Sequence, residues 1–536
     1  MSNRREFLKT GVLGAAAVAA STKLDLAASA QTTPVKPFEL EEITVAELRA
    51  GLDSARFTSQ RLVEMYSQRI ADIDKQGPAI NAVLEMNPDA MALAAKADQE
   101  RKDGVHGPMH GIPVLIKDNI ATADKMSTSG GSLALKDAKP PKDAFVAAQL
   151  RRAGAIILGK TNLSEWANIR STHSSSGWSG RGGQTKCPYA LDRNPSGSSS
   201  GSGSAVSANE CAVAIGTETD GSIVSPSCSN GLVGIKPTVG LASRTGIIPI
   251  SHTQDTPGPM ARTVADAAAL LTVMVGVDPE DPATKDSAGK AQDYLRALDP
   301  NGLKGARLGV LRKYANGTIH VDKLFTEALA VLKDAGAEII DPVEVTTMGK
   351  FDEGELHVLL YELKADLPKY FEWFGPTSPL KSLADAIKFN NEHADEEMPY
   401  FGQELFLQAQ EKGPLTSPEY LKALADGLRL SRDEGIDATM TKHKLDALIC
   451  PTGTCAWPID LVNGDGGYAS ASSLAAVAGY ARVTLPMGYV FGLPVGISFF
   501  GRAWSEAKLI KLAYAYEQKT KWRKAPKFLP TADVKH

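Results

Sequence analysis

The chain has 536 residues, of which 43% are hydrophobic and 22% charged, and 58 basic side chains nearly balance 62 acidic ones to give a formal net charge of −4. This composition is typical of a globular protein with a sizeable buried core, and it excludes disorder as the main state. The near balance of charge also argues against a nucleic-acid partner.

Residues 1–30 have the pattern of a twin-arginine export signal. Arg4-Arg5 precedes an apolar run from Gly11 to Ala20, and Ala28-Ser29-Ala30 offers small residues at a cleavage site. The apolar run is about ten residues long, whereas a membrane-spanning helix needs roughly 20. We therefore expect a bacterial protein that is periplasmic or secreted, with no stable membrane insertion once the signal is removed. An amphipathic N-terminal tail is the alternative.

The first part of the mature chain alternates helical patterns with short apolar strands. Apolar residues recur at helical spacing between Thr44 and Lys102, and 144–153 also has a helical pattern. Short apolar runs at 111–117, 155–159 and 212–215 predict buried strands. This alternation indicates an α/β sheet covered by helices.

The second part returns to the same pattern after a long helical stretch. Strands are expected at 306–311, 337–341, 445–449 and 494–500, with a helix at 322–335. Residues 355–440 are charged and mostly helical, with an aromatic cluster between 361 and 374 that either lines a pocket or packs in a core. We predict one domain over 31–536, in which about 280–440 is an inserted, mostly helical region on the substrate side.

The cysteines and histidines give no sign of a metal site. No Cys or His pair has metal-ligand spacing, so a zinc enzyme is not expected. Cys450 and Cys455 are close enough in sequence to form a disulfide, but buried thiols are the favoured interpretation.

Lys117 is the first candidate for chemistry, because it ends an apolar strand. Burial lowers the pKa of a lysine, and a neutral amine can act as a general base. The alternative is an ordinary lysine at the end of a strand, with its ammonium group in solvent.

A run of small residues from Pro195 to Ser204 is the second candidate. Small residues let backbones approach closely and expose N–H groups. A Walker phosphate loop is excluded because no Lys-Ser or Lys-Thr follows. A flexible linker is the alternative, but the position of the run between core elements favours an ordered turn.

Ser222 is the third candidate, in a turn after the strand at 212–215. Successive backbone N–H groups of Thr219, Asp220, Gly221 and Ser222 are suited to binding a developing oxyanion. The alternative is a serine that only shapes the turn.

Taken together, Lys117, Ser198 and Ser222 closely resemble the amidase signature family. The resemblance covers most of the mature chain, and it includes Gly159–Asn162, Gly231–Thr238, Asp255–Met260 and Gly492–Gly496. Within the family the chain looks most like the peptide amidases, which remove ammonia from C-terminal carboxamides of peptides; that likeness rests on Thr161–Trp166, Arg181–Thr185, Gly216–Ser222 and Ala513–Gln518. The resemblance implies a single α/β/α domain around a mixed, mostly parallel sheet of many strands.

The resemblance also implies a mechanism for a small amide or peptide-amide substrate. Ser222 is the expected nucleophile, Lys117 the base, and Ser198, preceded by a cis peptide bond, the relay between them. The four N–H groups of residues 219–222 are the expected oxyanion hole. No cofactor is needed, and the sequence indicates no particular oligomeric state.

Four residues depart from the family pattern. Ser196 and Ser200 replace glycines expected in the serine-rich loop. Asp220 stands where the family usually has glycine, and it either contacts the substrate or, as we favour, shapes the turn. Arg482 stands where a small residue is usual, and it either reaches the cleft to bind a negative group or is a solvated loop arginine.

Three other functions fit parts of this pattern. A broad acylamidase or esterase acting on aryl or aliphatic amides uses the same three residues, because specificity lies in the pocket. The glutaminase component of an enzyme that modifies aminoacyl-tRNA belongs to the same family, but its partners are cytosolic, which disagrees with the predicted export. A non-catalytic exported binding protein needs none of the three residues.

Overall fold

The computed structural model describes residues 35–314, 318–466 and 471–534, and the predicted signal at 1–30 lies outside this range. The strands are β1 Val83–Met86, β2 Pro113–Lys117, β3 Ile156–Thr161, β4 Trp178–Ser179, β5 Gly183–Gln184, β6 Val213–Glu218, β7 Val233–Lys236, β8 Thr256–Ala261, β9 Arg307–Val310, β10 Glu338–Ile340, β11 Ala447–Pro451, β12 Arg482–Val490 and β13 Leu493–Phe500. β4 and β5 form a small sheet, and the other strands form one large sheet.

The helices surround this sheet. They are α1 Val45–Asp53, α2 Ser59–Ile73, α3 Ala90–Lys102, α4 Phe145–Arg152, α5 Ser200–Ser207, α6 Val224–Ser229, α7 Val264–Met274, α8 Ile319–Asp334, α9 Asp352–Phe374, α10 Leu383–Glu392, α11 Ala394–Glu397, α12 Glu404–Gln410, α13 Pro418–Leu428, α14 Ala438–His443, α15 Ser473–Val477 and α16 Glu506–Thr520. A π-helix, Arg429–Asp437, joins α13 to α14. Threonine side chains begin α1, α2, α7 and α8 by accepting a hydrogen bond from a backbone N–H group of the first turn.

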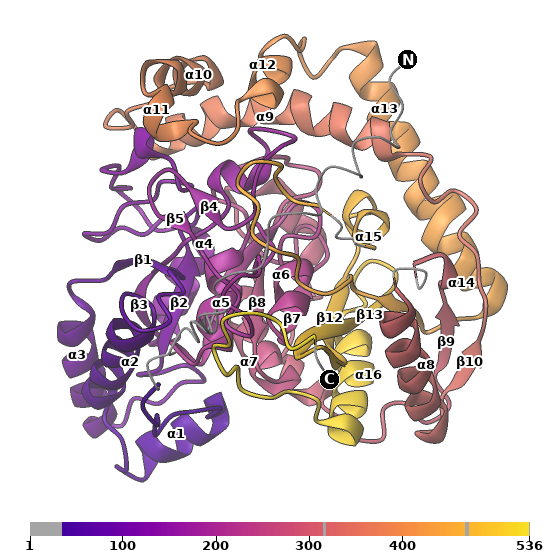
Figure 1. The fold of residues 1–536 in the computed structure, drawn as a ribbon, viewed down its shortest axis with the longest axis horizontal. Coiled ribbons are helices and arrows are strands. Elements are labelled where there is room, and N and C mark those ends of the chain that lie inside the picture. The colour runs from indigo at the N-terminus through magenta and orange to yellow at the C-terminus, as the bar shows by residue number, and fades with distance from the viewer. Residues whose placement is uncertain (1–34, 315–317, 467–470, 535–536) are drawn as a thin grey trace, which may run out of the picture. The chain divides into compact units, whose positions relative to one another are not determined.

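The large sheet has eleven strands in the order β1-β3-β2-β6-β8-β7-β12-β13-β11-β9-β10 (Figure 1). Four of its ten neighbouring pairs are parallel, and the five successive pairs from β6 to β11 are all antiparallel. The predicted single α/β/α domain with a mixed, many-stranded sheet is therefore confirmed. The expectation that the sheet is mostly parallel is wrong, because its centre is built from antiparallel neighbours such as the β12–β13 hairpin.

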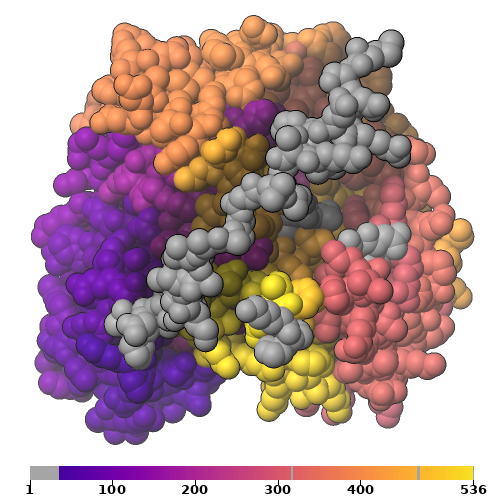
Figure 2. All heavy atoms as spheres, in the orientation of Figure 1, coloured from indigo at the N-terminus to yellow at the C-terminus, as the bar shows by residue number. Residues whose placement is uncertain are grey.

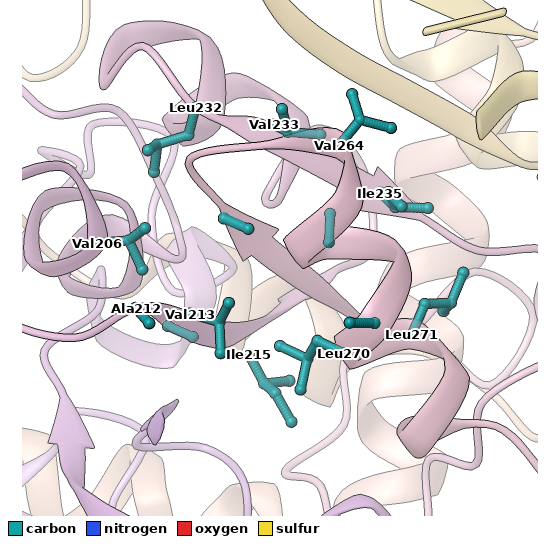
Figure 3. Close-up of a cluster of buried hydrophobic side chains, with 14 of the residues drawn as sticks. Val206, Ala212, Val213, Ile215, Leu232, Val233, Ile235, Val264, Leu270 and Leu271 are labelled. Atoms are coloured by element: carbon teal, nitrogen blue, oxygen red, sulfur yellow. The ribbon is translucent and has the colours of Figure 1, made fainter. Parts of the chain in front are cut away.

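The main core lies between the sheet and two groups of helices. α4, α7, α8 and α16 are linked by helix–helix contacts and pack on the sheet, and α5 and α6 form a second group of contacting helices. Figure 3 shows side chains of α5, β6, β7 and α7 in one buried cluster, with Val206, Val213, Val233 and Leu270 among them. Burial of such side chains contributes about 25 cal/mol per Å² of apolar surface, so this layer fixes the position of β6.

The region predicted as an inserted helical segment at about 280–440 contains β9 and β10, which join one edge of the sheet. Its first helix, α8, lies between these two strands along the chain, and the mostly helical part that follows begins with α9. Helices α9 to α13 gather along one side of the view in Figure 1, and Figure 2 shows the same orange segments on that side of the surface. A separate apolar cluster lies here and includes Phe371 and Phe374 of α9, so these two aromatic residues are core residues. No helix in the described ranges has the length and apolar character required to cross a bilayer.

Candidate active site

Lys117 lies at the carboxyl end of β2, and all five residues of this strand are buried. Its Nζ lies 2.7 Å from Ser198 Oγ and 2.9 Å from Thr217 Oγ1. Burial lowers the pKa of Lys117 to about 7, although the negative charges of Asp255 and Glu218 oppose this shift. Lys117 is therefore a buried amine in contact with a predicted site residue, and the alternative of an amine in solvent is wrong.

Ser198 lies in an ordered and tightly packed loop. The Gly197–Ser198 peptide bond is cis, as the family resemblance implies. A side chain at Gly197 would place its Cβ 2.3 Å from Ser164 Oγ, so only glycine fits here. The small residues that follow form α5, which is buried throughout. The interpretation of the whole tract as a loop is thus incomplete, since half of it is a helix.

Ser222 lies in the turn between β6 and α6. Its carbonyl oxygen accepts a hydrogen bond from the Ser199 N–H group at 3.3 Å, so its backbone adjoins the Ser198 loop. Its hydroxyl is partly exposed and forms no hydrogen bond within the described residues. The structure therefore brings the side chains of Lys117 and Ser198 into direct contact, and brings Ser222 to this pair through the backbone. Hydrogen bonds between catalytic groups often tighten only when substrate binds.

The backbone N–H groups of residues 219–222 form no hydrogen bond with any described part of the chain. By contrast, the next two N–H groups, those of Ile223 and Val224, donate to Glu218 Oε2 at 2.8 and 3.0 Å. Gly221 has a φ of +80°, a conformation that glycine adopts without strain. The turn thus holds four successive unpaired donors next to the Ser222 hydroxyl, which is the arrangement that an oxyanion requires.

Three polar residues beside this site were not predicted from the sequence. Asn119 Nδ2 donates to Thr217 Oγ1 at 2.9 Å, so Thr217 connects Asn119 to Lys117. Asp255 accepts hydrogen bonds from Thr219 Oγ1 at 2.6 Å and from the N–H groups of Ile250 and Ser251. Thr217 and Asp255 both lie in segments on which the family resemblance rests. Side chains alternate between the two faces of a sheet along a strand, so the pattern of β6 could have indicated the face on which Thr217 lies.

Two adjoining hollows border these residues. The smaller, of about 10 Å³, is lined by Asn119, Ser198, Thr217 and Asp255 among others, and its size is close to the ~10–15 Å³ that one water molecule needs. The larger, of about 550 Å³, is open to solvent and includes Tyr370 and Trp373 of α9. Arg244, Ile247 and Asp255 line both hollows. The small hollow beside Ser198 and the open cleft therefore share three lining residues.

A family model described as amidase matches residues 61–510 of the chain. The chain belongs to the amidase signature family. A native peptide amidase from Stenotrophomonas maltophilia has a similar structure, with a TM-score of 0.87, 52% sequence identity, and coverage of 92% of this chain and 100% of that one. A peptide amidase in complex with the competitive inhibitor chymostatin is 52% identical, with a TM-score of 0.89 over 91% of this chain and 100% of that one. A probable amidase from Arabidopsis thaliana is 43% identical over 92% of this chain and 93% of its own length. The chain is therefore a hydrolase that acts on amides.

The origin of the relatives corrects one prediction. Besides the plant protein, fungal proteins from Schizosaccharomyces pombe and Arthroderma benhamiae match at 37% and 38% identity over 91% and 93% of this chain and over 87% and 89% of their own lengths. These relatives argue against bacterial twin-arginine export, so the prediction of a periplasmic or secreted protein is wrong. Two arginines before a short apolar run form a pattern of low specificity, which explains the error.

Two of the residues of this amidase that depart from the family pattern, Asp220 and Arg482, have structural partners. Asp220 accepts a hydrogen bond from Ser473 Oγ of α15 at 2.6 Å. Burial and the charge of Asp220 raise the pKa of Glu355, on α9, well above its usual range. Arg482 is wholly buried in β12, and its Nε donates to Ser498 Oγ at 2.9 Å. Both interpretations of Arg482 are therefore wrong, since it lies in the core and not in a cleft or a solvated loop.

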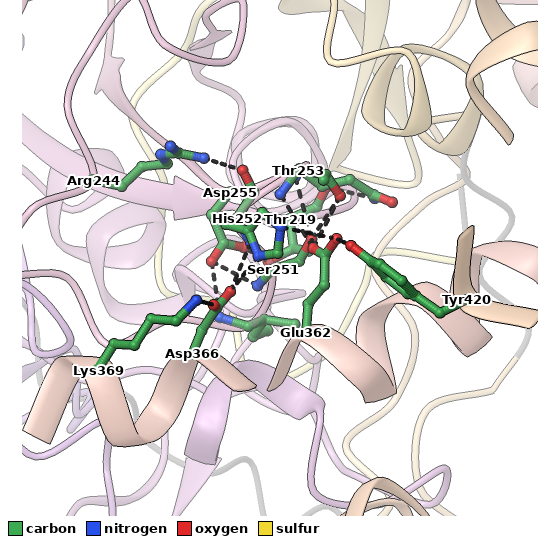
Figure 4. Close-up of polar contacts among 12 residues, drawn as sticks. Thr219, Arg244, Ser251, His252, Thr253, Asp255, Glu362, Asp366, Lys369 and Tyr420 are labelled. Carbon is green, nitrogen blue, oxygen red and sulfur yellow. Dashed lines mark hydrogen bonds and ion pairs between the residues drawn. The ribbon is translucent and has the colours of Figure 1, made fainter. Parts of the chain in front are cut away.

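Cys450 and Cys455 form no disulfide with each other, which confirms the favoured interpretation. Among the described residues of the amidase, His252, Glu362 and Asp366 form the one group with the proximity of metal ligands. Figure 4 shows how these side chains are already occupied. His252 Nδ1 lies 2.7 Å from Asp366, Tyr420 and Ser251 donate to Glu362, and Lys369 donates to Asp366 at 2.8 Å. A cation would have to displace these donors, so the group fits a hydrogen-bond network that joins α9 to residues 251–253.

Proposed function

We propose that this amidase is a serine amidohydrolase that converts C-terminal peptide amides to acids and ammonia, with Ser222 as nucleophile, Ser198 as relay and Lys117 as base. The observation that carries the proposal is the 2.7 Å contact between Lys117 Nζ and Ser198 Oγ at a wholly buried lysine. A lysine with a pKa of about 7 is neutral in about half of the molecules at neutral pH. It can therefore accept a proton under ordinary conditions.

In the acylation step, Ser222 Oγ attacks the carbonyl carbon of the amide. Its proton passes to Ser198 Oγ as the Ser198 proton passes to neutral Lys117 Nζ. The negative charge that develops on the carbonyl oxygen is bound by the free N–H groups of residues 219–222. Lys117 then returns its proton through Ser198 to the amide nitrogen, the C–N bond breaks, and ammonia leaves an acyl-Ser222 enzyme.

The deacylation step repeats this sequence with water as the nucleophile. Water loses a proton through Ser198 to Lys117, attacks the acyl carbon and forms a second oxyanion at the same N–H groups. The proton returns to Ser222 Oγ as the ester bond breaks, and the carboxylic acid is released. Thr217 Oγ1 and Asn119 hold the Lys117 amine in place through both steps.

The choice of peptide amides rests on two comparisons of identity. The peptide amidase structures are 52% identical to this chain, whereas a component of the glutamyl-tRNA(Gln) amidotransferase from Pseudomonas syringae is 32% identical over 90% of this chain and 98% of its own length. The predicted export no longer argues against a glutaminase of that kind, so the difference in identity is what favours the peptide amidase.

The test is ammonia release from three related substrates by the purified protein. We expect release from a peptide with a C-terminal carboxamide, no release from the same peptide as the free acid, and slow release of aniline from the matching anilide. Aniline release at a comparable rate would instead favour a broad acylamidase, and a preference for free glutamine would favour a glutaminase.

The mechanism is tested by single substitutions at the three residues. Ser222→Ala, Ser198→Ala and Lys117→Ala should each lower kcat by several orders of magnitude, on the order of 10⁴-fold or more. Ser200→Ala is the matched control, because Ser200 is equally buried two residues from Ser198 but makes only long hydroxyl contacts of 3.4 and 3.5 Å. Ammonia release that persists in Ser222→Ala would overturn the assignment of the nucleophile.

A further inference from the structure

Asp255 is a buried carboxylate that accepts a hydrogen bond from Thr219 of the oxyanion turn and lines the same small hollow as Ser198, and no step of the mechanism above uses it. We propose that Asp255 is a positioning residue, which holds the Thr219 end of the oxyanion turn in place and keeps a negative charge beside the Lys117–Ser198 pair. This inference rests on the proposed function and extends it to a residue outside the relay.

The two carboxylate oxygens of Asp255 have separate partners. Oδ2 accepts hydrogen bonds from the N–H groups of Ile250 and Ser251 at 2.8 and 2.9 Å. Oδ1 accepts from Thr219 Oγ1 at 2.6 Å. Because two successive backbone donors fix the plane of the carboxylate, Oδ1 is left pointing at Thr219, as Figure 4 shows.

Thr219 is the first of the four residues whose N–H groups are free. Its hydroxyl is held by Asp255, and its carbonyl oxygen accepts a hydrogen bond from Gln254 Nε2 at 3.3 Å. Gln254 Nε2 also donates to Glu355 Oε1 at 2.8 Å. The side chain and the carbonyl group of Thr219 are thus held by two neighbouring residues, Asp255 and Gln254. The direction of the N–H groups at the start of the oxyanion turn therefore depends on the position of the loop that carries these two residues.

The loop itself is fastened to the helical region. Ser251 Oγ donates to Glu362 at 2.5 Å, and Thr253 donates to the same oxygen. His252 bonds to Asp366, one turn further along α9. Figure 4 shows these contacts beside Asp255, with the side chains of Glu362 and Asp366 of α9 reaching the loop. The position of Thr219 is therefore set by a chain of contacts that runs from α9 through residues 251–255.

The charge of Asp255 acts on the other half of the site. Two carboxylates face Lys117, namely Asp255 and Glu218, and the charge of each favours the protonated amine. Glu218 is itself faced by Lys236 and accepts two backbone N–H groups, so its charge is partly compensated. Asp255 is faced by the guanidinium of Arg244, which is already paired with Asp281. Asp255 is therefore the main negative charge that offsets the burial of Lys117.

The ionisation of Asp255 fits this role at working pH. Burial raises the pKa of Asp255 to about 6, despite the hydrogen bonds from Thr219, Ile250 and Ser251. The pKa of Lys117 is about 7, so Asp255 is already mostly ionised in the pH range where Lys117 loses its proton. Removing the charge at residue 255 should therefore lower the pKa of Lys117, which becomes a weaker base that is neutral at lower pH.

The experiment compares wild type with Asp255→Asn, Thr219→Val and Asp74→Asn by the pH dependence of ammonia release from a peptide carboxamide. In Asp255→Asn, the acid limb of kcat/KM should move to lower pH, by about one pH unit, because the charge of Asp255 raises the pKa of Lys117 and the amide carries no charge. The plateau kcat should also fall about tenfold, because the contact with Thr219 is weakened. Thr219→Val leaves the Asp255 carboxylate in place, although loss of the Thr219 hydrogen bond raises its pKa, so this variant should lower kcat by a similar factor and move the acid limb less than Asp255→Asn does.

Asp74→Asn is the matched control. Asp74 is also buried and accepts hydrogen bonds from two successive N–H groups, of Ala82 and Val83, but it does not face Lys117. It should keep the wild-type acid limb and kcat. If Asp255→Asn fails to fold, Asp255→Glu keeps the charge and displaces the oxygen from Thr219, so it should behave like Thr219→Val. The inference would be overturned by a wild-type kcat in both Asp255→Glu and Thr219→Val. It would also be overturned if the acid limb of kcat/KM did not move in folded Asp255→Asn.

A second readout is independent of turnover. The Lys117 side chain can be titrated by NMR of ¹³Cε-labelled lysine, with its signal assigned by its loss in Lys117→Met. The midpoint should be lower in Asp255→Asn than in wild type and unchanged in Asp74→Asn. If the wild-type protein releases no ammonia from any substrate, the proposed function fails, and this midpoint alone decides whether Asp255 controls Lys117.

Discussion

A buried lysine with a pKa near 7 destabilises the fold, and this cost can be measured without any substrate. In the unfolded chain the pKa of Lys117 is 10.5, and in the folded protein burial lowers it to about 7. Between these two values the unfolded state binds more protons, so the free energy of unfolding rises with pH. The free-energy cost of burying Lys117 is absent above pH 10.5, grows as the pH falls below that value, and reaches its full size as the pH falls through 7. We therefore predict that wild type gains stability relative to Lys117→Met as pH is raised.

The expected size follows from the two pKa values. For a shift from 10.5 to about 7, the pH-dependent part of the difference in unfolding free energy between wild type and Lys117→Met changes by about 3 kcal/mol between pH 6 and pH 9. The hydrogen bonds that methionine loses at Ser198 and Thr217 contribute roughly 1 kcal/mol each, but their contribution is the same at both pH values. The change with pH therefore isolates the ionisation of Lys117.

Lys160 provides an internal comparison for the same measurement. It is equally buried, with a pKa lowered by burial to about 8, and it donates to Thr128 Oγ1 and to the carbonyl oxygen of Ile120, away from the relay. For Lys160→Met the same calculation gives a smaller change, of about 1 kcal/mol, because the pKa of Lys160 is lowered less than that of Lys117. Urea unfolding followed by tryptophan fluorescence at several pH values measures both. A difference for Lys117→Met that does not vary with pH would refute the reasoning, because it would mean that Lys117 is charged when buried.

Three further predictions concern the surroundings of the site. Gly221→Ala should lower kcat by about 100-fold with little change in KM, since alanine disfavours the φ of +80° and its Cβ would lie 3.0 Å from Ser472 Oγ; steady-state ammonia release tests this. Arg482→Ala should lower the free energy of unfolding by about 3 kcal/mol and leave KM unchanged, because Arg482 is a core residue; a raised KM in a stable protein would contradict this. Burial alone lowers the pKa of His252, but Asp366 and Glu362 outweigh it and raise this pKa, so the contribution of His252 to stability is present below pH 6.5 and lost as pH rises through the raised value. His252→Gln should consequently melt at a lower temperature than wild type at about pH 6 and at the same temperature at about pH 9, and equal melting temperatures at both values would exclude the ion pair.

Sequence patterns correctly predicted several strands that alternate with helices along the chain. The apolar runs at 111–117, 155–159, 212–215 and 494–500 correspond to β2, β3, β6 and β13, because continuous burial leaves an unbroken apolar run. The contact between Lys117 and Ser198 was expected from the family resemblance alone, since no local pattern brings together residues that lie on different elements.

The strands that were not predicted from the sequence contain residues or patterns that are typical of turns, helices or loops. β8 contains Pro257, Gly258 and Pro259, residues that normally mark turns, yet it lies in the middle of the sheet. This is tolerated because β7 pairs only with Met260 and Ala261, so no donor is needed from the two prolines on that side. β1 has four residues inside a stretch of helical periodicity, and β12 begins with Arg482, whose charge suggested a loop. Asp255 was likewise overlooked, because the residues that it contacts lie in a loop and a turn.

The change of strand direction in the middle of the sheet has a consequence for folding. β2 and β6 are parallel, so Lys117 and Glu218 end their strands at the same edge, and β8 runs the opposite way, so Asp255 stands immediately before its first residue at that edge. Glu218 pairs with Thr256 across the β6–β8 ladder, and a slip of one residue would turn these side chains to the other face. Assembly of the proposed site therefore requires the β2–β6 and β6–β8 ladders both to form in the correct register. The smallest continuous piece of chain that holds all of these groups runs from 117 to 255, which makes enzyme activity a stringent reporter of native folding in this half of the molecule.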